Sequence, residues 1–294
     1  MMDLREYQER ALRTDVIPGS GDTPIVVPLL GLAGEVGELV SEYKKQLRDG
    51  EANLQFKQRV AEELGDILWY LSNVASKFSL DLTAVAESNL RKCGDRWGYR
   101  AKGKEAHAAQ FDLAYPERER LPRQFEFTVS TIAEHGKIKM RAFVGGVKFG
   151  SDLTDNAYSE DGYRYHDLFH VSNAAFLNWS PVLRDVLNCK RKSNPLVDEV
   201  EDGGRAAAIE EGISAMVFAY AKDHALLEGV TVLDYELLRT IKTMTSHLEV
   251  ARCTAGEWED AILKGYAIWR EVSRRGAGTI SVDLDARSLT YRER

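Results

Sequence analysis

The chain has 294 residues and a formal net charge of −7, and its 44% hydrophobic and 29% charged content is typical of a globular protein of about two domains. The negative charge argues against general nucleic-acid binding. We see no apolar run of the length that a bilayer crossing needs, so we expect neither nucleic acid nor a membrane as a partner.

Helical periodicity dominates the first third of the chain. The pattern predicts helices near residues 3–14, 27–49, 55–77 and 82–97. Pro28 suits a first helical turn, Gly50 follows the second helix, and Asp81 suits an N-cap. We therefore expect an all-α bundle at the N-terminus.

Two pairs of carboxylates lie at helical spacing in this bundle, Glu35 with Glu38 and Glu63 with Asp66. Residues three apart share one helical face, so each pair projects as a unit. At about 100° per residue, Glu63 lies in the centre of an apolar stripe and Asp66 at its edge. The stripe consists of Val60, Ile67, Tyr70 and Val74. Glu42 projects between the members of the first pair.

These carboxylates favour a bound cation. A single acidic pair is most simply a solvated helix face, but a glutamate inside an apolar stripe needs a partner for its charge. Four glycines would let two helices approach closely and bring the acids together. These are Gly31, Gly34, Gly37 and Gly65. Oxygen-only ligands suit Mg²⁺, Mn²⁺ or Ca²⁺ rather than zinc.

The acidic motif, ExxE followed after a spacer by ExxD, resembles that of the MazG-like, all-α nucleoside triphosphate pyrophosphohydrolases. The resemblance extends in family order over approximately residues 1–100. It is carried by the strings REYQERALRT, PLLGLAGEVGELVSEYKKQLRDG, EELGDILWYLSNVA and AESNLRKCGDRWG.

This resemblance implies a helical bundle that works as a homodimer or homotetramer. It also implies Mg²⁺, for which Mn²⁺ could substitute, held by the catalytic acids Glu35, Glu38, Glu63 and Asp66. An activated water would convert a nucleoside or deoxynucleoside triphosphate to the monophosphate and pyrophosphate. That chemistry asks the protein mainly for positioning and charge neutralisation. Which glutamate orients the water is left open.

Substrate contacts are expected from the helix after the ExxD motif. Asn89, Lys92 and Arg96 recur there at three- and four-residue steps and match the family's polar and basic positions. The resemblance therefore implies that they contact the triphosphate. An ordinary solvated face is the alternative. Tyr70 could stack on the base, although an aromatic residue one turn past an acid more often belongs to a core.

We divide the chain into a MazG-like pyrophosphohydrolase domain over residues 1–105, a linker over 106–123, and a C-terminal domain over 124–294. In the last part, QFEFTVSTI and KIKMRAFVGGVKFG predict a β-hairpin, onto which GTISVDLD and ARSLTYRER could close. Helices are predicted over 165–179, 206–224, 234–250 and 255–275. The fold class is thus mainly α: an all-α bundle, then a helix-rich α+β domain with a small antiparallel sheet.

A second polar cluster lies in this domain. His166, Asp167 and His170 occur in YHDLFH, and Glu210 and Glu211 lie on a later helix. Two histidines one turn apart can share a metal ion, and a carboxylate from another helix could complete the site. The glutamate of HExxH is missing, and one His-Asp dipeptide does not establish an HD-type phosphohydrolase. A hydrogen-bonded structural or substrate-contacting cluster is the alternative.

The remaining features assign no further chemistry. Residues 124–294 resemble an extension attached to MazG-like domains, through YHDLFHVSNAAFLNWSPVLR and VEDGGRAAAIEEG, but the resemblance implies no activity for it. KRKSNPLVDEVEDGGR is expected to be an exposed loop, with anion binding as the alternative. Three widely spaced cysteines predict a reduced, cytoplasmic protein. The alternatives to the pyrophosphohydrolase are a nucleotide sensor with weak turnover and a second metal-dependent phosphohydrolase site in the C-terminal domain.

Overall fold

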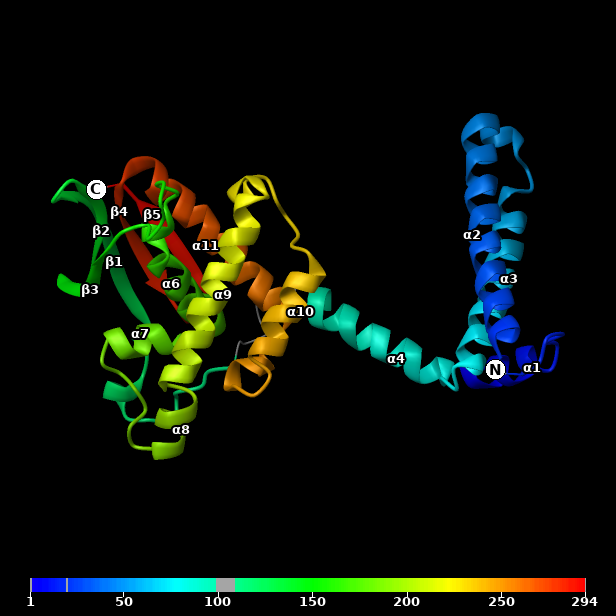
Figure 1. The fold of residues 1–294 in the computed structure, drawn as a ribbon, viewed down its shortest axis with the longest axis horizontal. Helices are drawn as coiled ribbons and strands as arrows, with labels where there is room; N and C mark the ends of the chain where they lie inside the picture. Colours follow the sequence, from blue (N-terminus) through cyan, green and yellow to red (C-terminus); the bar gives the residue numbers. More distant parts are fainter. Residues whose placement is uncertain (1, 20, 99–108, 294) are drawn as a thin grey trace. The chain divides into compact units, whose positions relative to one another are not determined.

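The computed structural model describes residues 2–19, 21–98 and 109–293 and confirms a mainly helical chain with a small antiparallel sheet in its second part (Figure 1). The chain divides into two compact units, Met1–Cys93 and Gly94–Arg294. The described part of the expected linker, residues 109–123, contributes Phe111 and Leu121 to the core of the second unit. Residues 106–108 of that linker and 99–105 of the expected first domain lie outside the described residues.

The first unit consists of four α-helices in its described residues: α1 (Leu4–Leu12), α2 (Asp22–Asp49), α3 (Phe56–Lys77) and α4 (Leu82–Cys93). The 3-10 turn η1 (Gly50–Ala52) joins α2 to α3, which pack along each other. Gln8 of α1 ties the end of α3 to the start of α4, because its Nε2 donates to the carbonyl of Leu80 at 2.8 Å and its Oε1 accepts from the amide of Leu82 at 2.8 Å.

The start of α2 differs from the prediction. The helix begins at Asp22, so Pro28 lies inside it rather than in its first turn. Pro24 is the proline in the first turn, where an amide N–H would have no intrahelical acceptor. The sequence pattern thus identified the right kind of start signal but placed it one proline too late.

Close approach of the helices occurs at Gly31. A Cβ added there would lie 2.2 Å from Cε1 of Tyr70, so the ring of Tyr70 on α3 packs directly on the backbone of α2. Gly34, Gly37 and Gly65 have no atom within 4 Å of such a Cβ. Of the predicted glycine contacts, Gly31 is therefore the one made within the described chain.

A long exposed stripe runs along α2. Its members recur at alternating steps of four and three residues, as in the seam of a coiled coil. They are Leu29, Ala33, Val36, Val40, Tyr43 and Leu47. By length and composition alone, the helical segment Asp22–Ala52 could also cross a membrane, contrary to our expectation, and 6% of its most apolar window is buried. The same properties belong to helices that pack on a partner helix.

The second unit is built around a five-stranded antiparallel sheet of order β3-β2-β1-β4-β5. Its strands are β1 (Gln124–Glu134), β2 (Lys137–Val144), β3 (Val147–Leu153), β4 (Ala277–Asp283) and β5 (Ser288–Arg292). The last two strands close onto the first hairpin as predicted, with Phe127 of β1 opposite Ile280 of β4. Gly145 and Gly146, both at positive φ, divide the second predicted strand into β2 and β3.

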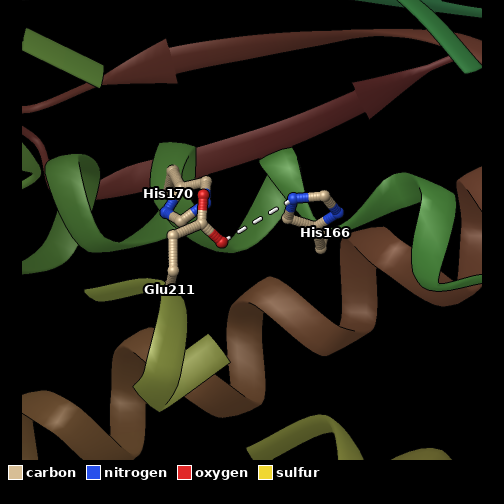
Figure 2. A group of neighbouring side chains, drawn as sticks. All are labelled: His166, His170 and Glu211. Carbon is tan, nitrogen blue, oxygen red and sulfur yellow. Dashed lines mark ion pairs between the residues drawn. The ribbon is translucent and has the colours of Figure 1, made fainter. Parts of the chain in front are cut away.

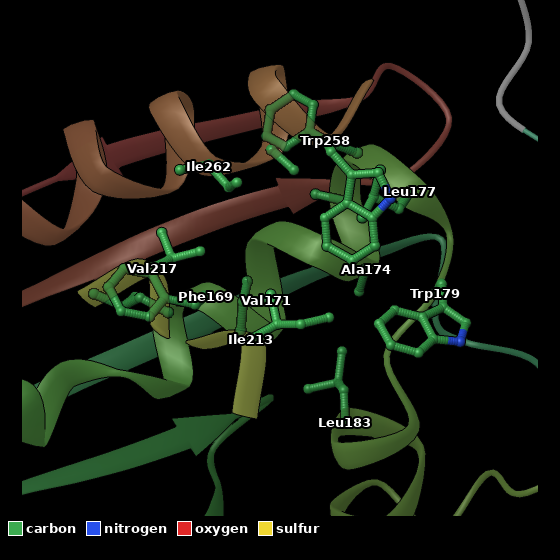
Figure 3. Packing of buried hydrophobic residues seen from close by; sticks show 14 of the residues in the cluster. Phe169, Val171, Ala174, Leu177, Trp179, Leu183, Ile213, Val217, Trp258 and Ile262 are labelled. Carbon is green, nitrogen blue, oxygen red and sulfur yellow. The ribbon is translucent and has the colours of Figure 1, made fainter. Parts of the chain in front are cut away.

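Helices surround a core centred on α6, in which all residues from Asp167 to Leu177 are buried (Figure 3). Phe169 of α6 stacks on Tyr266 of α11 at 4.6 Å between ring centroids. The four predicted helices are confirmed, and α7 and α8 are additional short ones. The bounds are α6 (Asp167–Leu177), α7 (Pro181–Val186), α8 (Pro195–Val200), α9 (Gly204–Lys222), α10 (Tyr235–Met244) and α11 (Ala255–Arg275). Short turns are η2 (Gly94–Gly98), η3 (Glu117–Glu119), η4 (Tyr163–Tyr165), η5 (Ala225–Leu227) and η6 (Glu249–Arg252).

The prediction of an exposed loop for KRKSNPLVDEVEDGGR is wrong in two respects: its centre forms the short helix α8, and Arg191 near its start is buried. Arg191 is 1% exposed and donates to Asp202 at 2.7 Å and to Glu249 at 2.6 Å. Next to it, Arg184 donates to Asp112 at 2.7 Å, also in the interior. Because its guanidinium is paired with these two carboxylates, Arg191 links segments of the second unit and is not placed to bind an external anion.

The cysteines differ in environment. Cys189 and Cys253 are buried, and burial raises the pKa of these thiols to about 11 and about 12. Cys93, the last residue of the first unit, is half-buried, and its Sγ lies 3.6 Å from Oδ1 of Asn89.

The Gly31 contact predicts a selective effect on stability. Gly31→Ala should lower the free energy of unfolding of the first unit by about 1–3 kcal/mol, because the new methyl group would displace the ring of Tyr70. Gly37→Ala on the same helix meets no atom and should be neutral or stabilise by up to about 1 kcal/mol. Denaturant titration followed by circular dichroism measures both. Equal effects at the two positions would contradict the assigned contact.

Candidate functional site

Helices α2 and α3 bring three of the predicted acids together. One carboxylate oxygen each from Glu35, Glu63 and Asp66 lie within 4.8 Å of one another. Glu35 and Glu63 are half-buried, whereas Asp66 is exposed. Glu38 is exposed and lies outside this group of three, but its charge still acts on Glu63. We call these four residues the acidic cluster.

Glu63 is the electrostatic centre of the acidic cluster. Its pKa is raised, first by burial and then by the negative charges of Glu35, Glu38, Asp66 and Glu42. Carboxylates that repel one another in this way are stabilised together when a cation lies between them. The prediction that Glu63 lies within an apolar stripe agrees with its half-buried position on α3.

Glu42, which projects between Glu35 and Glu38, is buried. It is 3% exposed, and its Oε1 accepts from Nζ of Lys45 at 2.5 Å, while Oε2 has no hydrogen-bond partner among the described residues. Its charge reaches Glu63, so it adds to the negative potential behind the acidic cluster.

The donor set of the acidic cluster fits a hard divalent cation. Its members offer carboxylate oxygens alone, which Mg²⁺ and Mn²⁺ prefer and which zinc does not. Three of these oxygens are already close enough to share one ion after small side-chain rotations. The oxygen atoms come from two packed helices, so the scaffold and not a loop sets their positions.

Tyr7 is a neighbour of the acidic cluster that our reasoning from sequence missed. Burial and the charge of Asp66 raise the pKa of its phenol, which places the α1 residue within electrostatic reach of the acids. A neutral phenol can donate a hydrogen bond to a carboxylate or a phosphate. The only sequence signal was its place in REYQERALRT, a string that carried the family resemblance.

The expected substrate contacts have different surroundings. Tyr70 packs on Gly31 and meets Trp69 edge to face at 4.9 Å, so its ring also belongs to the interface of α2 and α3. Asn89 and Lys92 are exposed on α4. Arg96 belongs to the second unit, where its Nη2 donates to the carbonyl of Leu233 at 2.6 Å.

The second predicted cluster also assembles, on helices α6 and α9 of the second unit. Figure 2 shows the rings of His166 and His170 on either side of the carboxylate of Glu211. Nε2 of His170 lies 3.3 Å from Oε1 of Glu211, and Nε2 of His166 lies 3.8 Å from Oε2. Oδ1 of Asp167 lies 3.9 Å from Nε2 of His166, and burial raises the pKa of the Asp167 carboxyl.

The adjacent glutamates of this cluster have separate environments. Glu210 is fully buried, and its oxygens accept from Nδ2 of Asn173, Oγ of Ser180 and the amide of Val182, each at 3.0 Å. The side chain of Glu211 is 43% exposed. Burial opposes a charge on His170, but the two carboxylates outweigh it and raise the pKa of its imidazole to about 10.

Comparison with known proteins agrees with this division of the chain. Residues 28–100 match the MazG nucleotide pyrophosphohydrolase domain, and residues 106–294 match the MazG C-terminal domain. The first match contains all of the acidic cluster. The chain is 35% identical over 101 residues to the Gene 37 protein of Mycobacterium phage L5, an alignment that covers 32% of this chain and 89% of that protein. No solved structure matches the chain.

Both parts of the chain thus match families defined by MazG, and the second match alone covers more than half of its length. The geometry of the acidic cluster agrees with the first of these matches. The chain belongs to the MazG family, with a nucleotide pyrophosphohydrolase domain followed by a MazG C-terminal domain.

Proposed function

We propose that this protein hydrolyses nucleoside and deoxynucleoside triphosphates to the monophosphate and pyrophosphate, with Mg²⁺ held by Glu35, Glu38, Glu63 and Asp66. The observation that carries the proposal is the convergence of three of these carboxylates within 4.8 Å inside a MazG domain. Burial, and then repulsion from the neighbouring carboxylates, raises the pKa of Glu63, and a bound cation would relieve that repulsion.

The proposed reaction is a hydrolysis at the α-phosphate. The oxygen of a water molecule bonds to the α-phosphorus, the bond from that phosphorus to the bridging oxygen breaks, and pyrophosphate leaves with the bonding electrons. Bound Mg²⁺ would neutralise phosphate charge and orient the triphosphate. The acids of α2 and α3 fix the position of this chemistry, and one of their carboxylates accepts the proton of the water.

Side chains around the acidic cluster would bind the rest of the nucleotide. We assign phosphate contacts to Lys92 and Asn89, which are exposed on α4, and a base contact to the accessible edge of Tyr70. Tyr7 is added to this set because its phenol is within reach of the charge of Asp66. The guanidinium of Arg96 has its own acceptor in the carbonyl of Leu233, which makes it the weakest member of the expected set.

We further propose that a second copy of the chain covers the exposed stripe of α2, giving a homodimer or a dimer of dimers. The stripe has the four-three spacing of a helix–helix seam, and Val40 and Leu47 in it are 64% and 71% exposed. Patches of this kind are typical of protein–protein interfaces. A reduced, cytoplasmic setting without nucleic-acid partners stays our expectation and is compatible with the free thiols of all three cysteines.

Replacement of the central acid should abolish turnover. Glu63→Gln removes a charge from the acidic cluster and should lower kcat/KM for pyrophosphate release by at least about 100-fold, because loss of an outer-sphere partner of a metal already costs 10–100-fold. Glu62→Gln is the matched control, since Glu62 is exposed and its Oε1 only accepts from Gln58 at 3.1 Å. Steady-state pyrophosphate release from a panel of nucleotides measures both.

The same assay separates enzyme from sensor. A sensor would bind a nucleotide in the presence of Mg²⁺ yet release no pyrophosphate from any member of the panel. Full activity of the Glu63→Gln variant would instead show that the catalytic site lies outside the acidic cluster.

Removal of divalent ions should stop the reaction reversibly. Treatment with a chelator should reduce pyrophosphate release to background, and added Mg²⁺ or Mn²⁺ should restore it, because an oxygen-only donor set suits both ions. Zn²⁺ should restore it poorly. Activity that persists in excess chelator would contradict the metal dependence.

The α2 seam predicts a change of oligomeric state. Val40→Glu places a charge in the proposed interface and should weaken association of the chain by about 100-fold or more. Lys57→Glu, a charge reversal at an exposed position of α3 outside the stripe, is the control and should leave the assembly intact. Sedimentation velocity over a range of concentrations gives the answer. A monomeric parent protein would contradict the proposed assembly.

A further inference from the structure

The cluster on α6 and α9 has the features of a prepared ligand site. His166 precedes α6 directly and His170 lies one turn later, so both rings project from one side of a helix whose residues are all buried. Glu211 reaches them from α9 (Figure 2). The acidic cluster uses none of these residues, and they form a site of their own within the second unit.

The ring of His166 is oriented by the backbone. Its Nδ1 lies 2.9 Å from the carbonyl oxygen of Tyr163, and the ring stacks on that of Tyr163 with centroids 4.6 Å apart. Because a carbonyl oxygen only accepts, Nδ1 carries the proton of the neutral ring. The lone pair of that ring is therefore on Nε2, which faces Glu211.

The ring of His170 lies beside Glu210. Its Nδ1 is 3.0 Å from Oε1 of Glu210, a carboxylate that three donors hold in place. A carboxylate beside the distal nitrogen of an imidazole is the usual outer partner of a histidine that ligates metal. Nε2 of His170 then faces Glu211, as that of His166 does.

The fully buried imidazole of His170 also lacks satisfactory partners. Within the part of the chain that the structure describes, neither ring nitrogen has a partner with hydrogen-bond geometry, although carboxylate oxygens lie 3.0 and 3.3 Å away. Buried polar atoms in this state are rare and commonly indicate a bound ion or water. The nitrogen that points at Glu211 is thus aimed into the cluster, and an ion bound there would take the place of its proton.

The separations suit a small ion. Ligand atoms around a tetrahedral ion with bonds of about 2.0–2.1 Å lie about 3.3 Å apart. The nitrogen–oxygen separations of 3.3 and 3.8 Å from Glu211 to the two histidines approach this value. The side chain of Glu211 is 43% exposed, so solvent reaches this side of the cluster.

We propose that His166, His170 and Glu211 bind a divalent transition-metal ion of the zinc class, with the carbonyl of Tyr163 and the carboxylate of Glu210 orienting the two imidazoles. Two nitrogens and one oxygen favour such an ion over Mg²⁺. Of the two adjacent glutamates, the exposed Glu211 is the ligand, and the buried Glu210 is a positioning residue. Asp167, with Oδ1 3.9 Å from Nε2 of His166, is within reach as a further oxygen ligand.

Co²⁺ binding to the full-length Glu63→Gln protein, free of any affinity tag, tests the site. The Glu63→Gln substitution is used because it weakens metal binding at the acidic cluster. Co²⁺ bound through imidazole nitrogen gives visible ligand-field absorption. One equivalent should bind after chelator treatment, and Zn²⁺ should displace it. His166→Ala and the near-isosteric Glu211→Gln should each weaken binding by at least about 100-fold, more than loss of an outer-sphere partner does.

His224→Ala is the matched control. The ring of His224 likewise stacks on a tyrosine, Tyr220, at 4.0 Å, and its Nδ1 lies 2.7 Å from the carbonyl of that residue. The His224→Ala substitution should leave Co²⁺ binding unchanged. Circular dichroism confirms that each variant is folded.

Two results would overturn the site. One is a folded Glu63→Gln protein that takes up no Co²⁺. The other is uptake that Glu211→Gln and His166→Ala leave intact, which would favour a purely structural ion pair between His170 and its glutamates. Neither result bears on pyrophosphate release by the parent protein, so this proposal and the proposed function fail independently.

Discussion

A charge that leaves water needs a partner, and this requirement organises both units of the protein. In the second unit, Arg184 and Arg191 are buried and paired with Asp112 and with Asp202 and Glu249. The pairs with Asp112 and Glu249 join segments that are far apart in the chain. Removal of one partner would leave an unpaired charge in the interior and would destabilise the fold by several kcal/mol. In the first unit, the charges that act on the half-buried Glu63 are those of other carboxylates, and for this reason we propose a cation as their common partner.

Much of the fold follows from local patterns that the sequence displays. The period of apolar residues predicts α2, α3, α6, α9, α10 and α11, and strand alternation predicts the hairpin and the final pair. The same projection places Glu63 on the inner face of α3 without any knowledge of its neighbours. Which side chains share one face of a helix depends only on their spacing within that helix, so a single sequence is enough to predict it.

Contacts between segments could not be predicted in this way. A basic run such as KRK looks solvated until Asp202 and Glu249, the latter 58 positions away, are brought beside Arg191. Glu210 and Glu211 are identical in type and adjacent, but Glu210 is the one held in the interior, by donors from Asn173, Ser180 and Val182 that lie far from it in the sequence. Glycine spacing likewise cannot tell that Gly31, rather than Gly34, faces a ring on α3.

The unequal burial of the cysteines makes one position of this chain chemically addressable. Alkylating reagents attack the thiolate, a form that burial suppresses at Cys189 and Cys253 near neutral pH. Cys93 is the more accessible thiol, and it is the last residue of the first unit. A fluorophore or spin label could therefore be attached at the end of the first unit without any engineered substitution, and its signal would test the nucleotide binding proposed for one unit and the metal binding proposed for the other.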